Sequence, residues 1–190
     1  MFCIENTKIS NIQSDVYSYF TKIIAEKAKI KLNRKLVKNL LIPMLYGAST
    51  KTISNFAKFP EQNIKHLIRI LMCEFNLKKI KKDIEKQINK NQYFYNFFGR
   101  PIYENDLSKK TRLIQNYIQS TAADICHIGY SNVVNFINKN GLKSYIVYTR
   151  HDSILIDVHP DENEYIEKFG VLIGKIDKYN INFLTTTKEV

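Results

Sequence analysis

Residues 143–158 read KSYIVYTRHDSILIDV, and this stretch decides the fold class. Two runs rich in β-branched and aromatic residues, 143–149 and 153–158, flank a short polar segment. Such runs around a polar loop predict a β-hairpin with a polar tip. Asp152 lies at that tip, where its carboxylate is well placed to bind Mg²⁺. An aspartate in a hairpin loop is more commonly a simple turn former, so the hairpin alone leaves both interpretations open.

Helical periodicity predicts long helices on both sides of this hairpin. Pro43 is expected to kink the second of them, because proline has no N–H group to donate and its ring meets the preceding turn. Long helices around a small antiparallel hairpin predict an α+β fold. The expected helices span residues 14–29, 33–45, 49–59, 61–90, 108–138 and 161–178, with extended segments at 93–100 and 181–184.

The charge balance indicates a polyanionic partner. The 190 residues carry a formal net charge of +11, and the pI is about 9.4. A basic surface gains affinity for nucleic acid because each neutralised phosphate releases counterions. The alternative is that a biased base composition of the gene explains the many lysines. A hydrophobic fraction of 44% excludes a disordered chain.

The sequence also bears on location. It contains no run of eighteen apolar residues, so no membrane span is expected. The three cysteines are widely scattered, which is typical of free thiols in a reducing intracellular compartment. The Lys, Asn and Ile bias suggests an AT-rich genome, such as that of a phage, plasmid or organelle. The compartment itself is not readable from these features.

Four residues of the second expected helix share one face. Arg34, Lys38, Ile42 and Tyr46 are spaced four apart, about one helical turn each. Two cations one turn apart can grip a triphosphate, and the apolar and aromatic groups that follow lie where a base could stack. Basic residues at this spacing also commonly form a solvated face, and the spacing alone does not separate the two interpretations.

The residues that follow Gly99 and Arg100 form a second candidate region. Residues 116–125 read NYIQSTAADI, in which small side chains would let a nucleic-acid duplex or a backbone approach closely. A simple helix-packing face is the alternative.

Three stretches together resemble the family A DNA polymerases, the family of bacterial DNA polymerase I. RKLVKNLLIPMLYGAS, residues 34–49, resembles motif B, the fingers helix of that family. QSTAADI, residues 119–125, is similar to the palm helix, which also follows a Gly-Arg strand. YTRHDSILIDV, residues 148–158, resembles motif C. The three stretches occur in the family's order.

The motif B resemblance implies a nucleotide-binding role for the fingers helix. Arg34 and Lys38 would contact the triphosphate of a dNTP, Ile42 would stack near the base, and Tyr46 would lie by the template. Two positions depart from the family, because Ile42 stands where Phe or Tyr is usual and Pro43 where Gly is usual.

The other two stretches imply contacts with the DNA primer-template and with metal. Gln119 would read the minor groove, where amide groups meet acceptors shared by all base pairs. Arg112, Asn116 and Arg100 are the further nucleic-acid-binding candidates. His151 and Asp152 are the expected catalytic residues, with Asp152 as a ligand of Mg²⁺.

The resemblance implies a template-directed DNA polymerase that adds dNMP to a primer 3′ end by two-metal phosphoryl transfer. Residues 1–92 would form a fingers-like region and residues 93–190 a palm-like region. In the family, a second metal-binding aspartate lies in motif A, upstream of the helix placed at residues 14–29, and no such stretch occurs among residues 1–14. Either this chain is a fragment or degenerate copy of such an enzyme, or another polypeptide supplies motif A and the thumb. We expect the second, and activity of this chain by itself is an open question.

Two other functions compete with this one. A relationship to single-subunit phage-type RNA polymerases is favoured by Ser153, where family A usually has Glu, and by the short spacing between Asn116 and Gln119. The stretch QSTAAD at residues 119–124 favours the DNA enzymes instead. The third possibility is a non-catalytic, basic nucleic-acid-binding subunit.

Overall fold

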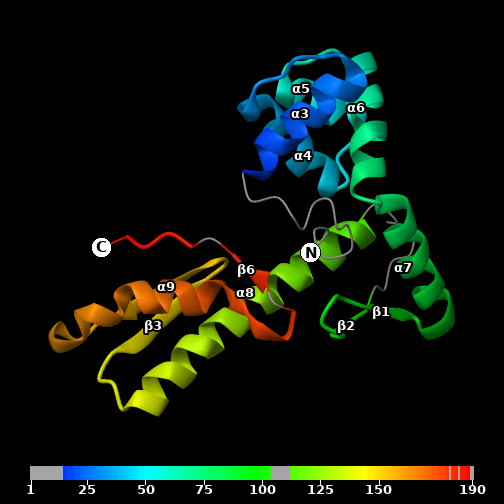
Figure 1. Ribbon diagram of the computed structural model, residues 1–190. Coiled ribbons are helices and arrows are strands. Elements are labelled where there is room, and N and C mark those ends of the chain that lie inside the picture. Colours follow the sequence, from blue (N-terminus) through cyan, green and yellow to red (C-terminus); the bar gives the residue numbers. More distant parts are fainter. Residues whose placement is uncertain (1–14, 104–111, 180, 184, 189–190) are drawn as a thin grey trace. The chain divides into compact units, whose positions relative to one another are not determined.

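The computed structural model describes residues 15–103, 112–179, 181–183 and 185–188 (Figure 1). The chain divides into two compact units, Met1–Gln119 and Ser120–Val190, which are described separately. Helices dominate the described residues, and every sheet among them is two-stranded and antiparallel. This confirms the predicted α+β fold. The proposed division into regions 1–92 and 93–190 concerns functional parts of the chain and stays a prediction.

From residue 15 on, the described part of the first unit begins with the five helices α3 to α7 (Figure 1). Three of them begin where the sequence predicts, because the side chains of Asp15, Asn33 and Ser49 each accept the backbone N–H of the residue three positions later. Their apolar faces form one core, in which Phe20, Ile24, Val37, Ile53, Ile64, Leu67 and Leu71 are fully buried. The helices are α3 (Val16–Ala28), α4 (Arg34–Leu45), α5 (Thr50–Ala57), α6 (Glu61–Glu74) and α7 (Leu77–Asn91).

The prediction of one helix over residues 61–90 was wrong. The chain forms α6 and α7 instead, because Asn76 adopts the left-handed conformation with φ 52° and breaks the helical hydrogen-bond pattern. Phe75 and Leu77 on either side are buried, so the break lets both helices turn apolar residues into the core. Asparagine tolerates this conformation better than most residues, and this was the overlooked signal.

The aromatic segment expected at 93–100 becomes the first strand of a small hairpin. Strand β1 (Tyr93–Tyr95) pairs with β2 (Pro101–Tyr103), and the buried Asn96 closes the turn by accepting the N–H groups of Phe98 and Arg100. Helix α8 (Arg112–Asn140) follows. Its expected start at residue 108 lies outside the described residues.

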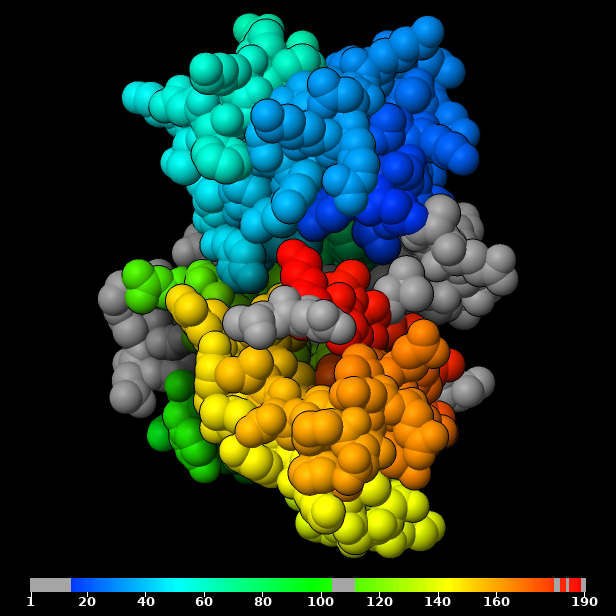
Figure 2. Space-filling model, turned by 90° about the vertical axis from the view of Figure 1, so that its left-hand side faces the viewer, coloured from blue at the N-terminus to red at the C-terminus, as the bar shows by residue number. Residues whose placement is uncertain are grey.

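The predicted polar-tipped hairpin is confirmed in the second unit. Strand β3 (Tyr145–Arg150) pairs with β4 (Ser153–Asp157), and Arg150 faces Ser153 across the tip. Val133, Ile137 and Phe169 form the core beneath the hairpin. The hairpin and the helix that follows it lie side by side in Figure 2, coloured yellow to orange.

The prediction of one helix over residues 161–178 was wrong. A 3₁₀ helix η2 (Pro160–Tyr165) leads into α9 (Ile166–Gly174), and β5 (Lys175–Ile176) then pairs with β6 (Ile181–Asn182), with a 3₁₀ turn η3 (Asp177–Tyr179) between them. The Glu162 carboxylate accepts the N–H groups of Lys143 and Ser144 and the Ser144 hydroxyl, which fixes η2 to the base of the hairpin.

None of the helices in the described ranges is both long and apolar enough to cross a membrane. Cys73 and Cys126 are free thiols there.

Candidate functional site

Helix α4 presents its predicted binding face to solvent. The opposite face buries Val37, Leu40, Leu41 and Met44 in the core of the first unit. As a result, Arg34, Lys38 and Tyr46 are exposed and Ile42 is half-buried. Pro43 stays inside the helix near its C-terminal end. The amphipathic pattern of α4 thus sets the orientation of all four residues.

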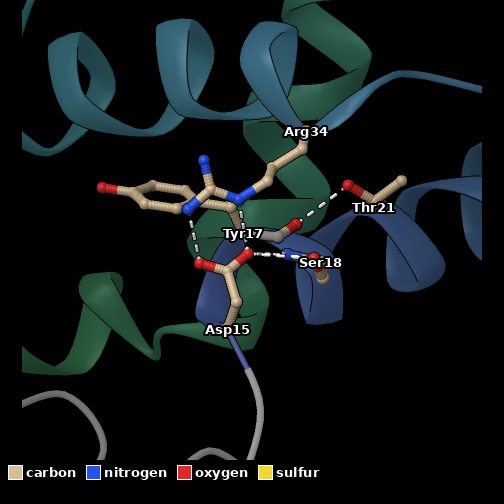
Figure 3. A network of polar contacts seen from close by, with 5 residues as sticks. All are labelled: Asp15, Tyr17, Ser18, Thr21 and Arg34. Carbon is tan, nitrogen blue, oxygen red and sulfur yellow. Dashed lines mark hydrogen bonds and ion pairs between the residues drawn. The ribbon is translucent and has the colours of Figure 1, made fainter. Parts of the chain in front are cut away.

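Arg34 is held by a carboxylate from the start of α3 (Figure 3). Its Nε and Nη2 atoms donate to Oδ2 and Oδ1 of Asp15 at 2.8 and 2.7 Å. Asp15 Oδ2 also accepts the backbone N–H and the hydroxyl of Ser18, both at 2.9 Å. The guanidinium carbon lies 5.1 Å from the centre of the Tyr17 ring, and Lys38 Nζ lies 6.0 Å from the same ring. Arg34 and Lys38, the first two cations of the predicted face, therefore both lie close to the Tyr17 ring.

The ion pair between Arg34 and Asp15 reduces the net positive charge on this face of α4. The hydrogen bonds from Arg34 hold the pKa of the Asp15 carboxyl well below its usual range. The carboxylate is therefore charged at any pH above that range, and the stability that it adds is fully present above the ordinary pKa of an aspartate and is lost as the pH falls from there through the lowered folded-state value. Because Arg34 is partly neutralised, Lys38 carries more of the net attraction toward an incoming anion.

The candidates for nucleic-acid contact lie in the first unit. Arg112, Asn116 and Gln119 are spaced by four and three residues along α8, so they share one side of the helix. Arg112 and Gln119 are exposed and Asn116 is half-buried, and the opposite side of α8 buries Leu113. Arg100 is exposed beyond the turn that Asn96 closes.

The tip of the β3–β4 hairpin carries the two expected catalytic residues. His151 and Asp152 are exposed and form the loop between the paired residues Arg150 and Ser153. His151 has a φ of 53°, a conformation that favours glycine. The Ser153 hydroxyl braces the loop by donating to the Arg150 carbonyl at 2.8 Å. A short, braced loop holds the Asp152 carboxylate at a defined place beyond the strands.

Asp152 borders a groove of about 770 Å³. The groove runs along β4, past the apolar residues Ile166, Phe169 and Ile173 of α9, to residues 185–188. The Thr185 hydroxyl donates to the Gly170 carbonyl at 2.9 Å, and the red C-terminal segment lies against the orange helix in Figure 2.

The residues present suit only part of a metal site. No group of three His, Cys, Asp or Glu side chains within the described ranges could enclose an ion. One exposed carboxylate matches the way in which Mg²⁺ is often held, by one or two carboxylates together with substrate phosphates. Asp152 therefore fits as one ligand of a site that other groups complete.

Two features of these sites were not predicted from the sequence. Asp15 lies at the start of the helix expected over residues 14–29, but its pairing with Arg34 joins residues 19 positions apart, and no local pattern signals it. Tyr130, whose hydroxyl donates to the carbonyls of His151 and Ser153, lies 23 positions before the second of them.

A family model and a solved structure both match this chain. The sequence model described as "DNA polymerase family A" matches residues 7–176. A solved structure, the POL domain of Pol1 from M. smegmatis in complex with DNA primer-template and dNTP, shares the fold with a TM-score of 0.69 at 22% sequence identity. The match covers 90% of this chain and 32% of that chain, so this chain spans about a third of the length of the solved protein.

Proposed function

Because the chain belongs to DNA polymerase family A, we propose that it provides the nucleotide-binding helix and one metal-binding aspartate of a template-directed DNA polymerase. The enzyme adds dNMP from a dNTP to the 3′ end of a primer. The observation that carries the proposal is the Asp152 carboxylate at the tip of a braced hairpin, in a chain that also exposes Arg34 and Lys38 on one helix face.

The nucleotide-binding role rests on the charge and exposure of α4. Lys38 and Arg34 grip the triphosphate, while the exposed Tyr46 and half-buried Ile42 lie further along the same face, near the base and the template. Ile42 offers an apolar side chain without an aromatic ring, so it contacts the base by packing only.

The primer-template role falls to polar groups of the first unit. Gln119 contacts the minor groove, and Arg112, Asn116 and Arg100 contact the backbone or the neighbouring groove edge. Phosphate contacts of this kind position the duplex without reading its sequence, as a polymerase that copies any template requires.

The metal role rests on the hairpin tip. Mg²⁺ bound by Asp152 would lower the pKa of the primer 3′-hydroxyl group and neutralise charge on the transferred phosphate. The hairpin's part is to hold the carboxylate at a fixed place, and His151 shapes the loop that presents it. Two-metal transfer needs at least one further carboxylate, and no group of three His, Cys, Asp or Glu side chains that could enclose an ion occurs among the described residues.

A second polypeptide that carries motif A and the thumb supplies this carboxylate in our proposal. Among the described residues, β4 has a strand partner on one side only, namely β3. The groove beside β4 is lined by Asp152 among other residues and has a volume of about 770 Å³. A strand placed there would bring its own carboxylate toward the hairpin tip.

The triphosphate role of Lys38 is tested by Lys38→Ala. Loss of one charge-assisted contact is expected to raise the Kd for dNTP roughly tenfold, while the Kd for primer-template changes less than about twofold. Equilibrium titrations with the complementary dNTP and with labelled duplex measure the two constants. Lys35→Ala is the matched control, since this exposed lysine lies on another side of α4 and should change neither constant. Equal losses for dNTP and duplex would contradict the assignment.

Asp15→Asn probes the Arg34 pair. Asparagine caps a helix as well as aspartate does, so α3 keeps its cap, but the negative charge beside the triphosphate is removed. Binding of dNTP is expected to tighten roughly threefold, because Arg34 is freed and a repulsion is lost. Glu26→Gln, which removes another exposed carboxylate of α3, is the control. The tightening of dNTP binding by Asp15→Asn should be smaller in an Arg34→Gln background. Weaker dNTP binding by Asp15→Asn would instead mean that Asp15 orients Arg34 for the nucleotide.

A further inference from the structure

We propose that Tyr130 is a positioning residue that fixes the direction of the Asp152 carboxylate through the backbone of the hairpin tip. The proposal rests on the proposed function, in which Asp152 binds a catalytic metal. The Tyr130 hydroxyl lies 3.0 Å from the carbonyl oxygen of Ser153 and 3.3 Å from that of His151. The His151 carbonyl group is bonded to the Asp152 nitrogen, and the Ser153 carbonyl group lies one residue beyond Asp152, so one side chain contacts the backbone before and after the residue that carries the carboxylate.

The loop needs such a contact because its backbone is in an uncommon conformation. His151 is the first of the two loop residues and has a positive φ, the arrangement of a hairpin turn in which glycine is usually preferred at that position. A side chain at a positive φ costs energy, and conformations of this kind persist when surrounding contacts fix them. The hydrogen bond to the His151 carbonyl is one such contact, and the Ser153 hydroxyl bond to Arg150 is another.

Tyr130 is itself well fixed. It is 7% exposed and lies on α8, with Cys126 one turn earlier on the same helix. Burial, together with the neighbouring Cys126 and Asp152, raises the pKa of Tyr130 to about 12. The hydroxyl has a single proton, which it donates to one of the two carbonyl groups at a time or shares between them.

Gly129, which precedes Tyr130 on α8, explains how α8 comes close enough to α9 and to the hairpin. A Cβ atom at this position would lie 2.2 Å from the carbonyl oxygen of Ile173 in α9. The absent side chain lets α8 pack directly against α9, beside the hairpin that Tyr130 contacts. The position of the hydroxyl is thus set by helix packing within the second unit and not by the loop itself.

Tyr130→Phe tests the proposal, because it removes the hydroxyl and keeps the ring. In the complete polymerase assembly, single-turnover primer extension should slow roughly ten- to a hundredfold, and the MgCl₂ concentration for half-maximal rate should rise. The Kd values for dNTP and for primer-template should stay within about twofold of the wild-type values, since neither ligand is bound by the hairpin backbone. Tyr148→Phe removes an exposed hydroxyl from β3 and should leave all four quantities unchanged.

The outcomes separate this proposal from the proposed function. If Asp152→Asn is inactive but Tyr130→Phe has the wild-type rate and MgCl₂ dependence, the positioning role is wrong and the metal role stands. If Tyr130→Phe weakens dNTP and duplex binding together with the rate, Tyr130 has a general structural role and the proposal is overturned. If Asp152→Asn itself retains activity, the proposed function fails first.

Discussion

Asp152→Asn is expected to reduce the rate of nucleotide addition at least about a thousandfold in the complete polymerase assembly. Asparagine has nearly the same size as aspartate and is also a common turn residue, so the hairpin should keep its backbone conformation. What is lost is the negative charge that binds Mg²⁺ beside the primer end. Single-turnover primer extension at saturating dNTP measures the rate directly.

The binding constants of this variant are as informative as its rate. Because Asp152 contributes to the transition state and not to gripping the nucleotide, the Kd values for dNTP and primer-template should change less than about threefold. Asp157→Asn is the matched control, since it removes an exposed carboxylate from the far end of the same strand. An assembly that keeps its rate without the Asp152 charge would show that the metal ligand was assigned to the wrong residue.

The second large effect is expected for stability. Gly129→Ala should lower the free energy of unfolding by about 3 kcal/mol, because the added Cβ would meet the Ile173 carbonyl oxygen at 2.2 Å. The contact is with backbone, so α8 and α9 must move apart to relieve it. The substitution would otherwise stabilise a helix interior, and a net loss therefore isolates the clash. Urea denaturation followed by circular dichroism measures the change.

Gly170→Ala provides a matched comparison on α9. There the added Cβ would lie 3.3 Å from the Thr185 hydroxyl, which is the end of a side chain that can turn away. The expected change is within about 1 kcal/mol in either direction. Equal stability of Gly129→Ala and the wild type would contradict the close packing of α8 on α9, and with it the route by which Tyr130 reaches the hairpin.

Much of the fold could be predicted from local sequence signals. The hairpin over residues 143–158 was predicted because β-branched and aromatic runs flank a polar loop, and the helices expected to start at residues 14, 33 and 49 begin beside the capping residues Asp15, Asn33 and Ser49. The exposed face of α4 followed from helical spacing alone. In each case the information lies within a few residues of the feature that it determines.

The features that were not predicted depend on contacts between distant segments. Asn76 breaks a helix whose apolar periodicity continues on both sides, and only packing of Phe75 and Leu77 makes the break favourable. Glu162 converts the start of an expected helix into a 3₁₀ turn by bonding the hairpin base. A local pattern carries no information about such pairings.

The same distinction applies to the candidate sites. Arg34, Lys38 and Asp152 could be selected from the sequence because their spacing and motif context are local. Their surroundings could not be selected in this way, since Asp15 and Tyr130 act across 19 and 23 residues of chain. These partners set how much charge Arg34 offers and where Asp152 points, and both quantities bear on the proposed chemistry.

Primer extension with separated components tests the central claim most directly. Labelled primer-template and MgCl₂ are incubated with each dNTP or each NTP singly, using this chain alone and this chain together with any polypeptide that co-purifies with it. We expect the assembly to add only the dNTP complementary to the template, and the chain alone to add none. Addition of NTPs in preference to dNTPs would instead support an RNA polymerase, and extension by the isolated chain would refute the need for a second polypeptide. An assembly that binds primer-template and dNTP yet adds no nucleotide would contradict the polymerase function itself.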